Sequence, residues 1–358
     1  MAKSVKLADV ARAAGVSQGT ASNVFSRPQL VRQEVRERVE ECAKQLGYGG
    51  PDPKGRLLRA GKVNAIGVVV MDKLSYFFND PYNREFMAGL AAVCDEHGAG
   101  VSLVSAVDQA SAAWNIGSAV VDGFIVQCIE DGDRLIELAR RRNLPFVAVD
   151  IDAGPNASSI WTDDQGGARQ AAEHLIGLGH RRFGILSLEI VGDGQTGPVD
   201  RARRLSSRSY GGTRNRLRGY EEAFAAAGID IEDVPIIESL NDRKGAAAGA
   251  AALFEAAPGM TAVLAMSDVL GLAVLDEARS RGVAVPGDLS VVGFDDVPEA
   301  ARAEPPLTTI AQPIAEKGRR AAKLILEGGP PRNEVLPVKL VVRGTTAPPP
   351  DASLLRRP

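Results

Sequence analysis

The stretch VKLADVARAAGVSQGTASNVF occupies residues 5–25. Its first part has apolar residues at helical spacing and predicts a short helix over 6–14, with one face formed by Leu7, Val10, Ala11 and Ala14. Gly15 can take the positive φ that ends a helix, and Ser17 is a good N-cap for a second helix. A third helix is predicted over about 33–46. Short helices joined by a tight glycine turn are typical of a helix-turn-helix unit.

The second helix of such a unit lies in the major groove of DNA, with its N-terminal residues toward the bases. Glutamine and asparagine side chains can make paired hydrogen bonds to adenine, and short hydroxyls suit phosphate oxygens. The candidate DNA contacts in this part of the chain are Lys6, Leu7, Ser17, Gln18, Gly19, Thr20, Ser22 and Asn23. The alternative interpretation is a three-helix cap whose polar residues only face solvent.

Charge is unevenly distributed along the 358 residues. Residues 1–62 contain twelve Lys and Arg side chains and six Asp and Glu side chains, which is a net charge of +6. The rest of the chain is therefore at −9, because the whole chain is at −3. A basic head on an acidic body is expected when one end meets phosphate groups, whereas a solvated basic face without a partner is the alternative.

From residue 64 onward, continuous apolar runs alternate with helical patterns. Such runs between helices are typical of parallel strands that are buried on both faces. We therefore predict a small all-α helix-turn-helix headpiece followed by a two-lobed α/β body of doubly wound parallel sheets. A ligand crevice is expected at the carboxyl ends of the strands. The predicted strands are 65–70, 100–105, 123–128, 146–150, 158–162, 182–188, 234–237, 262–266 and 290–295.

Composition divides the chain into four segments. The helix-turn-helix headpiece is expected over 1–50, and a Gly- and Pro-rich hinge segment follows over 51–62. The two-lobed body is expected over 63–346, and a disordered tail over 347–358. Within the body, residues 189–213 lack apolar periodicity and are interpreted as a mobile surface insertion.

No apolar stretch reaches 18 residues, so no membrane partner is expected. The first residues lack the apolar block of a signal peptide, and three distant cysteines are typical of reduced thiols: Cys42, Cys94 and Cys128. A cytoplasmic location is therefore expected, with association to the nucleoid when the protein is bound to DNA. No cofactor or metal is predicted, because His174 and His180 lack partners at metal-ligand spacing and are interpreted as structural.

Two short motifs that could indicate an enzyme are discounted. Gly15–Gly19 fits G-x-S-x-G but follows a predicted helix instead of a strand, and no His and Asp set supports it. Gly192–Gly197 fits G-x-G-x-x-G, but a Pro- and Arg-rich loop follows it where dinucleotide binding requires an apolar helix. The sequence therefore favours a protein that is not an enzyme.

Residues 5–48 closely resemble the DNA-binding headpiece of the lac-repressor-like (LacI/GalR) family of bacterial transcription regulators. The family pattern D-V-A-x-x-A-G-V-S-x-x-T-x-S is present as Asp9-Val10-Ala11, Ala14-Gly15-Val16-Ser17, Thr20 and Ser22. The resemblance covers essentially the whole chain, because it continues through PDPKGRLLR (51–59), HLIGLGHRRFGIL (174–186), RLRGYEEAF (216–224), VPGDLSVVGFDDVPEA (285–300) and PPLTTIAQP (305–313).

The resemblance implies a body similar to periplasmic sugar-binding proteins, a homodimer, and a hinge that contacts double-stranded operator DNA. In the hinge, Leu58 matches the apolar side chain that wedges between base steps in the minor groove, and Arg56 and Arg59 are further candidate DNA contacts. The positions that match effector contacts are Asp150, Arg216, Leu240, Ser267, Asp268 and Asp295. Carboxylates and an arginine that converge on a crevice can hold vicinal hydroxyls. The aromatic lid of some relatives is not evident near Leu240.

These observations predict a dimeric, sequence-specific repressor of transcription that is controlled by a small polar metabolite, a sugar or sugar derivative. Two alternatives belong to other classes. The body also suits the solute-binding protein of a transporter, which the basic head and the missing signal peptide disfavour. An enzyme on an α/β scaffold is disfavoured because the sequence offers no nucleophile–base pair or metal cluster.

Overall fold

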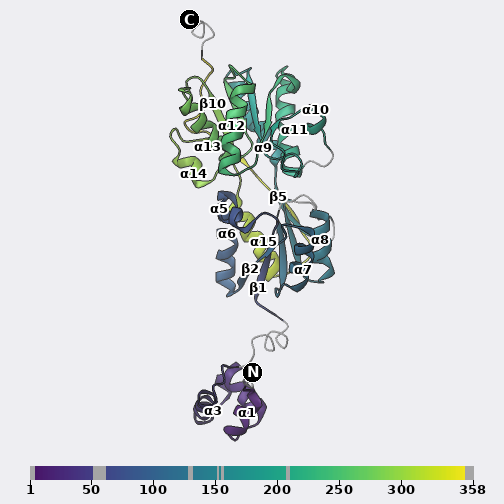
Figure 1. Cartoon of the computed structure of the whole chain (residues 1–358), viewed down its shortest axis with the longest axis vertical. Helices are drawn as coiled ribbons and strands as arrows, with labels where there is room; N and C mark the ends of the chain where they lie inside the picture. The colour runs from purple at the N-terminus through teal and green to yellow at the C-terminus, as the bar shows by residue number, and fades with distance from the viewer. Residues whose placement is uncertain are drawn as a thin grey trace. The chain divides into compact units, whose positions relative to one another are not determined.

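A computed structural model describes residues 5–50, 62–127, 132–150, 153–154, 157–206 and 210–350, and every structural statement below refers to these residues. The chain forms two compact units, one that ends at Val63 and one that begins at Asn64 (Figure 1). We describe each unit by itself and call them the headpiece and the body.

The headpiece contains the three predicted helices, α1 (Leu7–Ala13), α2 (Gln18–Ser26) and α3 (Gln33–Leu46), with a 3₁₀ turn η1 at Pro28–Leu30. Gly15 has a φ of +64° directly after α1, as expected for a residue that ends a helix. The small core is built from one face of each helix: Val10, Ala11, Ala14, Ala21, Val24, Val39 and Ala43. The prediction of a helix-turn-helix unit is therefore confirmed.

The body contains two sheets, and we call the part around each sheet a lobe. Lobe 1 has six parallel strands in the order β12-β5-β4-β3-β1-β2. They are β1 (Ala65–Val70), β2 (Gly100–Ser105), β3 (Gly123–Gln127), β4 (Phe146–Val149), β5 (Ser158–Thr162) and β12 (Asn333–Leu336). Its helices are α5 (Leu74–Asn79), α6 (Pro81–His97), α7 (Gln109–Ser118), α8 (Gly132–Arg141) and α15 (Ile314–Leu326).

Lobe 2 has seven strands in the order β13-β11-β10-β9-β6-β8-β7. The five inner strands are parallel, and the edge strands β7 and β13 are antiparallel to their neighbours. The strands are β6 (Phe183–Ser187), β7 (Gly197–Pro198), β8 (Ile236–Glu238), β9 (Ala262–Ala265), β10 (Ser290–Asp295), β11 (Thr308–Ala311) and β13 (Lys339–Val341). The helical elements are α9 (Asp164–Gly177), α10 (Arg201–Arg204), α11 (Gly211–Ala226), η2 (Ile231–Asp233), α12 (Arg243–Ala256), α13 (Asp268–Ser280) and α14 (Pro298–Arg302).

The apolar runs of the sequence form strands because both faces of each sheet are covered by helices (Figure 1). In β1, Val68 and Val70 belong to the core on the α6 side, whereas Val69 between them packs on the α7 side. This arrangement explains why the strands are continuously apolar instead of alternating. The predicted two-lobed α/β body is therefore confirmed.

The chain crosses between the lobes three times: after β5, after β11, and between β12 and β13. The region after β10 was not assigned from the sequence. Its strands β11, β12 and β13 have three or four residues each, and β12 and β13 are partly exposed, so their apolar signal is weak. These segments nevertheless join the lobes and supply one edge strand to each sheet.

Residues 189–206 are packed onto lobe 2, so the interpretation of this stretch as a mobile insertion is wrong. Ile190 is fully buried, and β7 pairs with β8. The guanidinium of Arg203 also donates two hydrogen bonds to the buried Glu238 carboxylate. Because polar contacts such as these hold the segment in place, its sequence shows no apolar periodicity, and the prediction of a mobile insertion failed for this reason. Residues 207–209 lie outside the described residues.

The predicted disorder from 347 onward is also wrong at its first residue. The amide of Ala347 donates to Ser290 Oγ at 3.0 Å, and its carbonyl oxygen lies 2.9 Å from Nε2 of the buried His180. His180 therefore has a structural role, as predicted. The last eight residues, 351–358, lie outside the described residues.

Helices α6 and α15 cross at backbone contact distance in lobe 1. A Cβ atom on Gly89 would lie 1.8 Å from the carbonyl oxygen of Ala315, and one on Gly318 would lie 2.1 Å from that of Phe86. No side chain can be accommodated at either position unless the helices separate. The two glycines therefore set the depth at which α15 packs on lobe 1.

We expect Gly89→Ala to lower the free energy of unfolding of the body by about 1–3 kcal/mol, because the added methyl group overpacks the crossing. Urea unfolding of the full chain measures this change. Gly117→Ala is the matched control, since its Cβ would meet nothing within 4 Å and alanine favours the helix. Equal midpoints for the wild type and Gly89→Ala would contradict the proposed close crossing.

Candidate nucleic-acid interface and ligand cleft

The N-terminus of α2 presents a polar, solvent-exposed face. Ser17 caps the helix, with its Oγ accepting a hydrogen bond from the amide of Thr20 at 3.0 Å. Gln18, Gly19 and Asn23 are exposed, whereas Ala21 and Val24 are buried against the other two helices. The core side chains fix the orientation of α2 and leave the predicted contact residues on its free side.

The other candidate DNA contacts differ in their exposure, and some of them lie outside the described residues. Lys6 is exposed at the start of α1, and its amide donates to the Asp9 carboxylate at 3.0 Å. Leu7 is half-buried against the headpiece core, so only part of its side chain is accessible. Thr20 and Ser22 are also half-buried. The hinge candidates lie outside the described residues: Arg56, Leu58 and Arg59.

The body contains a cavity of about 680 Å³ between the two lobes. Its walls come from the carboxyl ends of strands in both sheets, as expected for parallel α/β structures. Five of the six predicted effector residues line it: Asp150, Arg216, Leu240, Ser267 and Asp295. We call this cavity the cleft.

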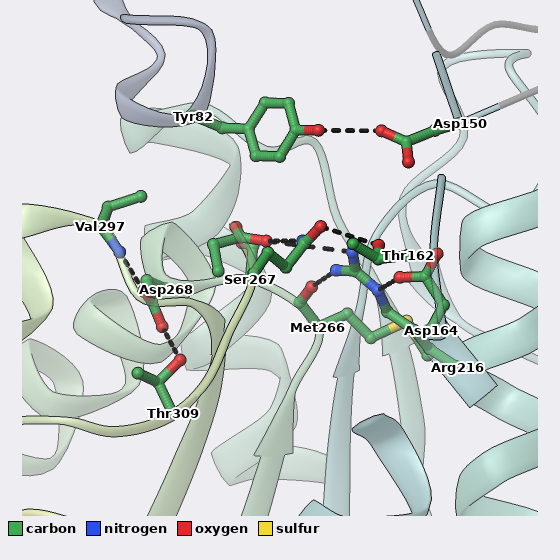
Figure 2. A network of polar contacts seen from close by, with 12 residues as sticks. Tyr82, Asp150, Thr162, Asp164, Arg216, Met266, Ser267, Asp268, Val297 and Thr309 are labelled. Atoms are coloured by element: carbon green, nitrogen blue, oxygen red, sulfur yellow. Dashed lines mark hydrogen bonds and ion pairs between the residues drawn. The ribbon is translucent and has the colours of Figure 1, made fainter. Parts of the chain in front are cut away.

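Arg216 of α11 is held rigidly in the wall of the cleft (Figure 2). Its Nε donates to Asp164 Oδ1 at 2.8 Å, and its guanidinium also donates to the carbonyl oxygen of Met266. Nη2 lies 3.9 Å from Asp295 Oδ1, and the guanidinium carbon lies 3.7 Å from the centre of the Phe294 ring. A buried cation needs such compensation, and the fixed fork can offer its remaining donor direction to a ligand.

The two carboxylates at strand ends sit on unusual backbone. Asp150, directly after β4, has a φ of +58°, and Asp295, the last residue of β10, has a φ of +122°. Non-glycine residues in this region carry local strain, which concentrates at functional sites. Burial raises the pKa of Asp295 well above its ordinary value, although Arg216 opposes the shift.

Asp268 does not line the cleft, contrary to its prediction as an effector contact. Its carboxylate is fully buried and accepts hydrogen bonds from Thr309 Oγ1 at 2.5 Å and from the amide of Val297 at 2.9 Å (Figure 2). The neighbouring Ser267 does face the cleft and donates to Asn241 Oδ1 at 2.6 Å. At the start of α13, Ser267 therefore points into the cleft, whereas the next residue, Asp268, points toward β11 and the segment after β10.

Sequence reasoning missed several residues of the cleft. Aromatic side chains line it after all, from α5, from the start of α6 and from the segment before α11: Tyr76, Phe77, Tyr82 and Tyr210. The Tyr76 hydroxyl donates to the carbonyl oxygen of Asn241 at 3.2 Å, which joins the two lobes. Residues 74–79 read LSYFFN, and this cluster of aromatic residues was a usable signal.

The cleft is rich in carboxylates. Seven acidic residues line it, against the two cations Lys73 and Arg216: Asp72, Asp80, Asp150, Asp164, Glu189, Asp242 and Asp295. Burial raises the pKa of Asp80 to about 6, although the amides of Tyr82 and Asn83 oppose the shift. A site of this charge suits ligands that donate hydrogen bonds and disfavours anionic ligands.

No group of three or more His, Cys, Asp or Glu in the described part of the chain could hold a metal ion. Cys42 and Cys94 are free thiols, and Cys128 lies outside the described residues. Among the described helices, none has the length and apolar character needed to cross a bilayer.

The raised pKa of Asp80 predicts a pH dependence of stability. On lowering the pH, the Asp80 carboxylate of the folded body binds a proton at about pH 6, whereas the same group in the unfolded chain binds one only near pH 4. The contribution of this protonation to the free energy of unfolding is therefore fully present below pH 4 and is lost as the pH rises through 6. Asp80→Asn keeps the N-cap and removes the titration. We expect the wild type to lose about 2 kcal/mol more stability than Asp80→Asn between pH 4 and pH 7. Urea unfolding midpoints of both proteins between pH 4 and pH 7 test this prediction. Midpoints that change with pH in parallel would contradict the raised pKa of Asp80.

Comparison with known proteins identifies the family. Residues 6–50 match the family described as bacterial regulatory proteins, lacI family, and residues 172–346 match a periplasmic binding protein-like domain. The HTH-type transcriptional regulator Rv3575c of Mycobacterium tuberculosis is 41% identical over 355 residues, covering 96% of this chain and 97% of the relative. The regulator IpsA of Corynebacterium glutamicum is 37% identical, covering 90% of each chain.

Solved structures agree with this assignment. The lac repressor dimer bound to operator and the anti-inducer ONPF has a TM-score of 0.73 at 27% identity, covering 96% of this chain and all of that chain. The complex of the transcriptional regulator CelR with cellobiose has a TM-score of 0.67 at 29% identity, covering 95% of this chain and 99% of that chain. The protein thus belongs to the lacI family of bacterial regulatory proteins and is a DNA-binding transcription regulator.

Proposed function

We propose that this protein represses transcription by binding operator DNA as a homodimer, and that a neutral polyhydroxylated molecule in the cleft controls this binding. The observation that carries the proposal is the cleft itself. It lies between two lobes that the chain joins three times, and both lobes contribute polar side chains to it. A ligand that touches both lobes can favour one arrangement of the body over another.

The chemistry of the cleft supports a sugar or a sugar derivative. Carboxylates at fixed positions accept hydrogen bonds from hydroxyl groups, and Arg216 donates one. The aromatic side chains provide apolar surface for the C–H face of a ring. A volume of about 680 Å³ is within the usual range for small-molecule sites. The regulator CelR, which is similar along most of its length, was solved with cellobiose.

Charge separates two classes of ligand. Seven acidic side chains against two cations disfavour a phosphorylated or carboxylated ligand, because such a ligand brings further acceptors to a site that offers few donors. The same excess favours a cationic amine as the second candidate. A ligand screen that contains neutral sugars, sugar phosphates and polyamines separates these possibilities.

Dimerisation would place two headpieces on a symmetric operator. Large apolar side chains are exposed on β2, on α7 and after α7: Val101, Trp114 and Val120. We propose that a second copy of the chain covers this region of lobe 1. One operator fragment is then expected to bind two chains.

Gln18 is expected to read bases. DNA fragments selected from a random pool by the wild type provide the cognate site. We expect Gln18→Ala to weaken binding to this site by about 1–3 kcal/mol and to leave binding to random DNA unchanged. Fluorescence anisotropy at fixed salt measures both affinities. Gln45→Ala is the matched control, because Gln45 is exposed on α3 and donates to Glu41 within its own helix. Equal losses on both DNAs would refute base recognition by Gln18.

Asp150 is expected to contact the ligand. In a thermal-shift screen of cellobiose, other neutral saccharides and polyols, a ligand at 100 times its Kd stabilises the wild type by about 2.7 kcal/mol. We expect Asp150→Asn to lose most of this shift and to keep its DNA affinity in the absence of ligand. Asp276→Asn on the exposed face of α13 is the control. A full shift with Asp150→Asn would place the ligand elsewhere.

A further inference from the structure

Lys317 is a lysine in the interior of lobe 1. It belongs to α15, its side chain is 1% exposed, and it lies next to Gly318 at the close crossing with α6. An ammonium group without water is costly unless opposite charge and hydrogen bonds compensate it. The contacts of Lys317 therefore indicate why a charge is kept at this position.

The Nζ atom of Lys317 is surrounded by acceptors. It lies 2.8 Å from Asp150 Oδ1 and 3.0 Å from Asp150 Oδ2, 3.0 Å from Tyr82 Oη, and 2.8 Å from Gln312 Oε1. The Tyr82 hydroxyl in turn donates to Asp150 Oδ2 at 2.8 Å (Figure 2). These acceptors engage all three protons of the ammonium, so Lys317 has no donor left for a ligand.

Asp150 is the member of this group that reaches the cleft. Its carboxylate is 11% exposed and lines the cavity, whereas Lys317 lies behind it. The backbone of Asp150 is in the left-handed region, at a φ of +58°. Oδ2 accepts from both Lys317 and Tyr82, while Oδ1 accepts only from Lys317 among the described contacts. Oδ1 therefore keeps a free acceptor direction.

We propose that Lys317 is a positioning residue for the effector, which holds the Asp150 carboxylate aimed so that Oδ1 accepts a hydrogen bond from an O–H or N–H group of the ligand. This inference rests on the proposed function, because it assigns a role within the same cleft. It also defines the ligand class more narrowly: the group that meets Asp150 must be a donor.

Gln312 connects Lys317 to lobe 2 through hydrogen bonds. Its Oε1 accepts from Lys317 and from Thr162 Oγ1 at 3.0 Å, and its Nε2 donates to Asp295 Oδ1 at 2.6 Å. Gln312 lies in one crossover between the lobes, and Thr162 lies at the start of another. A continuous chain of hydrogen bonds thus joins Asp150 in lobe 1 to Asp295 in lobe 2. A ligand bound to either carboxylate acts on a network that both lobes share.

The test compares Lys317→Met with the wild type in the full chain. Methionine has a similar volume and no charge, so Asp150 loses its main partner. Arg320→Met is the matched control, because Arg320 lies on the same helix, is 43% exposed and pairs with Glu316 and Glu334 instead of a cleft residue. The readouts are a crystal structure without ligand, DNA affinity without ligand, and calorimetry with cellobiose or the saccharide found in the screen.

We expect Lys317→Met to bind the saccharide at least about tenfold more weakly, the loss expected for one hydrogen bond to a charged group, and to keep its DNA affinity within about twofold. A role limited to folding would weaken both together. We further expect the effect to be non-additive: in an Asp150→Asn background, Lys317→Met is expected to change saccharide affinity less than about twofold. Additive losses would show that Lys317 acts independently of Asp150 and would overturn the proposal.

The crystal structure decides the proposal without any ligand. We expect the Asp150 carboxylate of Lys317→Met to leave its contact with Tyr82. An Asp150 that keeps its φ and this contact overturns the positioning role, even if no saccharide binds the wild type. Failure of every saccharide to bind the wild type would count against the proposed ligand class alone. If Lys317→Met does not fold, Lys317→Gln, which keeps a hydrogen-bond donor but is shorter and uncharged, is measured in the same way. We expect it to weaken saccharide binding in the same direction but by less, and an unchanged saccharide affinity would overturn the proposal.

Discussion

The balance of buried charge in the cleft is the constraint on which the rest of the body depends. Arg216 and Lys317 are both buried, and each is compensated by carboxylates that also face the cavity. Removing one partner would leave a buried charge without compensation, which costs more than the pair gains. The side chains that could recognise a ligand are therefore also the side chains that hold the strand ends in place, and this dual role explains their rigid placement.

The fold of the headpiece depends on interactions between residues close in sequence, whereas the fold of the body depends on pairing between distant segments. In the headpiece, a serine cap, a glycine turn and seven small apolar side chains define the whole unit. In the body, each strand needs neighbours from distant parts of the chain, and three crossovers hold the lobes together. A regulator built in this way can alter its body without altering the proposed DNA-binding surface of α2, because the contacts that fix α2 lie within the headpiece.

This difference explains how much could be predicted from the sequence. The helices of the headpiece and the buried parallel strands were predictable, because caps and apolar runs are local signals. The edge strand β12 was missed, because a partly exposed strand of four residues carries little apolar signal. Lys317 was missed since a lysine in an amphipathic helix normally faces solvent. Asp268 was misplaced because an acidic residue after a strand has the same pattern whether it faces the cleft or the core.

The contacts that join the lobes differ in strength, and this difference determines which of them a ligand can override. The pair between Arg84 and Glu299 joins α6 to α14, and both side chains are about half exposed, so its contribution is below about 1 kcal/mol. The hydrogen bond from Tyr76 to Asn241 is long at 3.2 Å. The bonds of Gln312 are shorter, buried and partly charge-assisted. A ligand can shift the lobes only by its differential affinity for their arrangements. The outer contacts are therefore weaker than the buried hydrogen bonds of Gln312, and a ligand needs less differential affinity to override them.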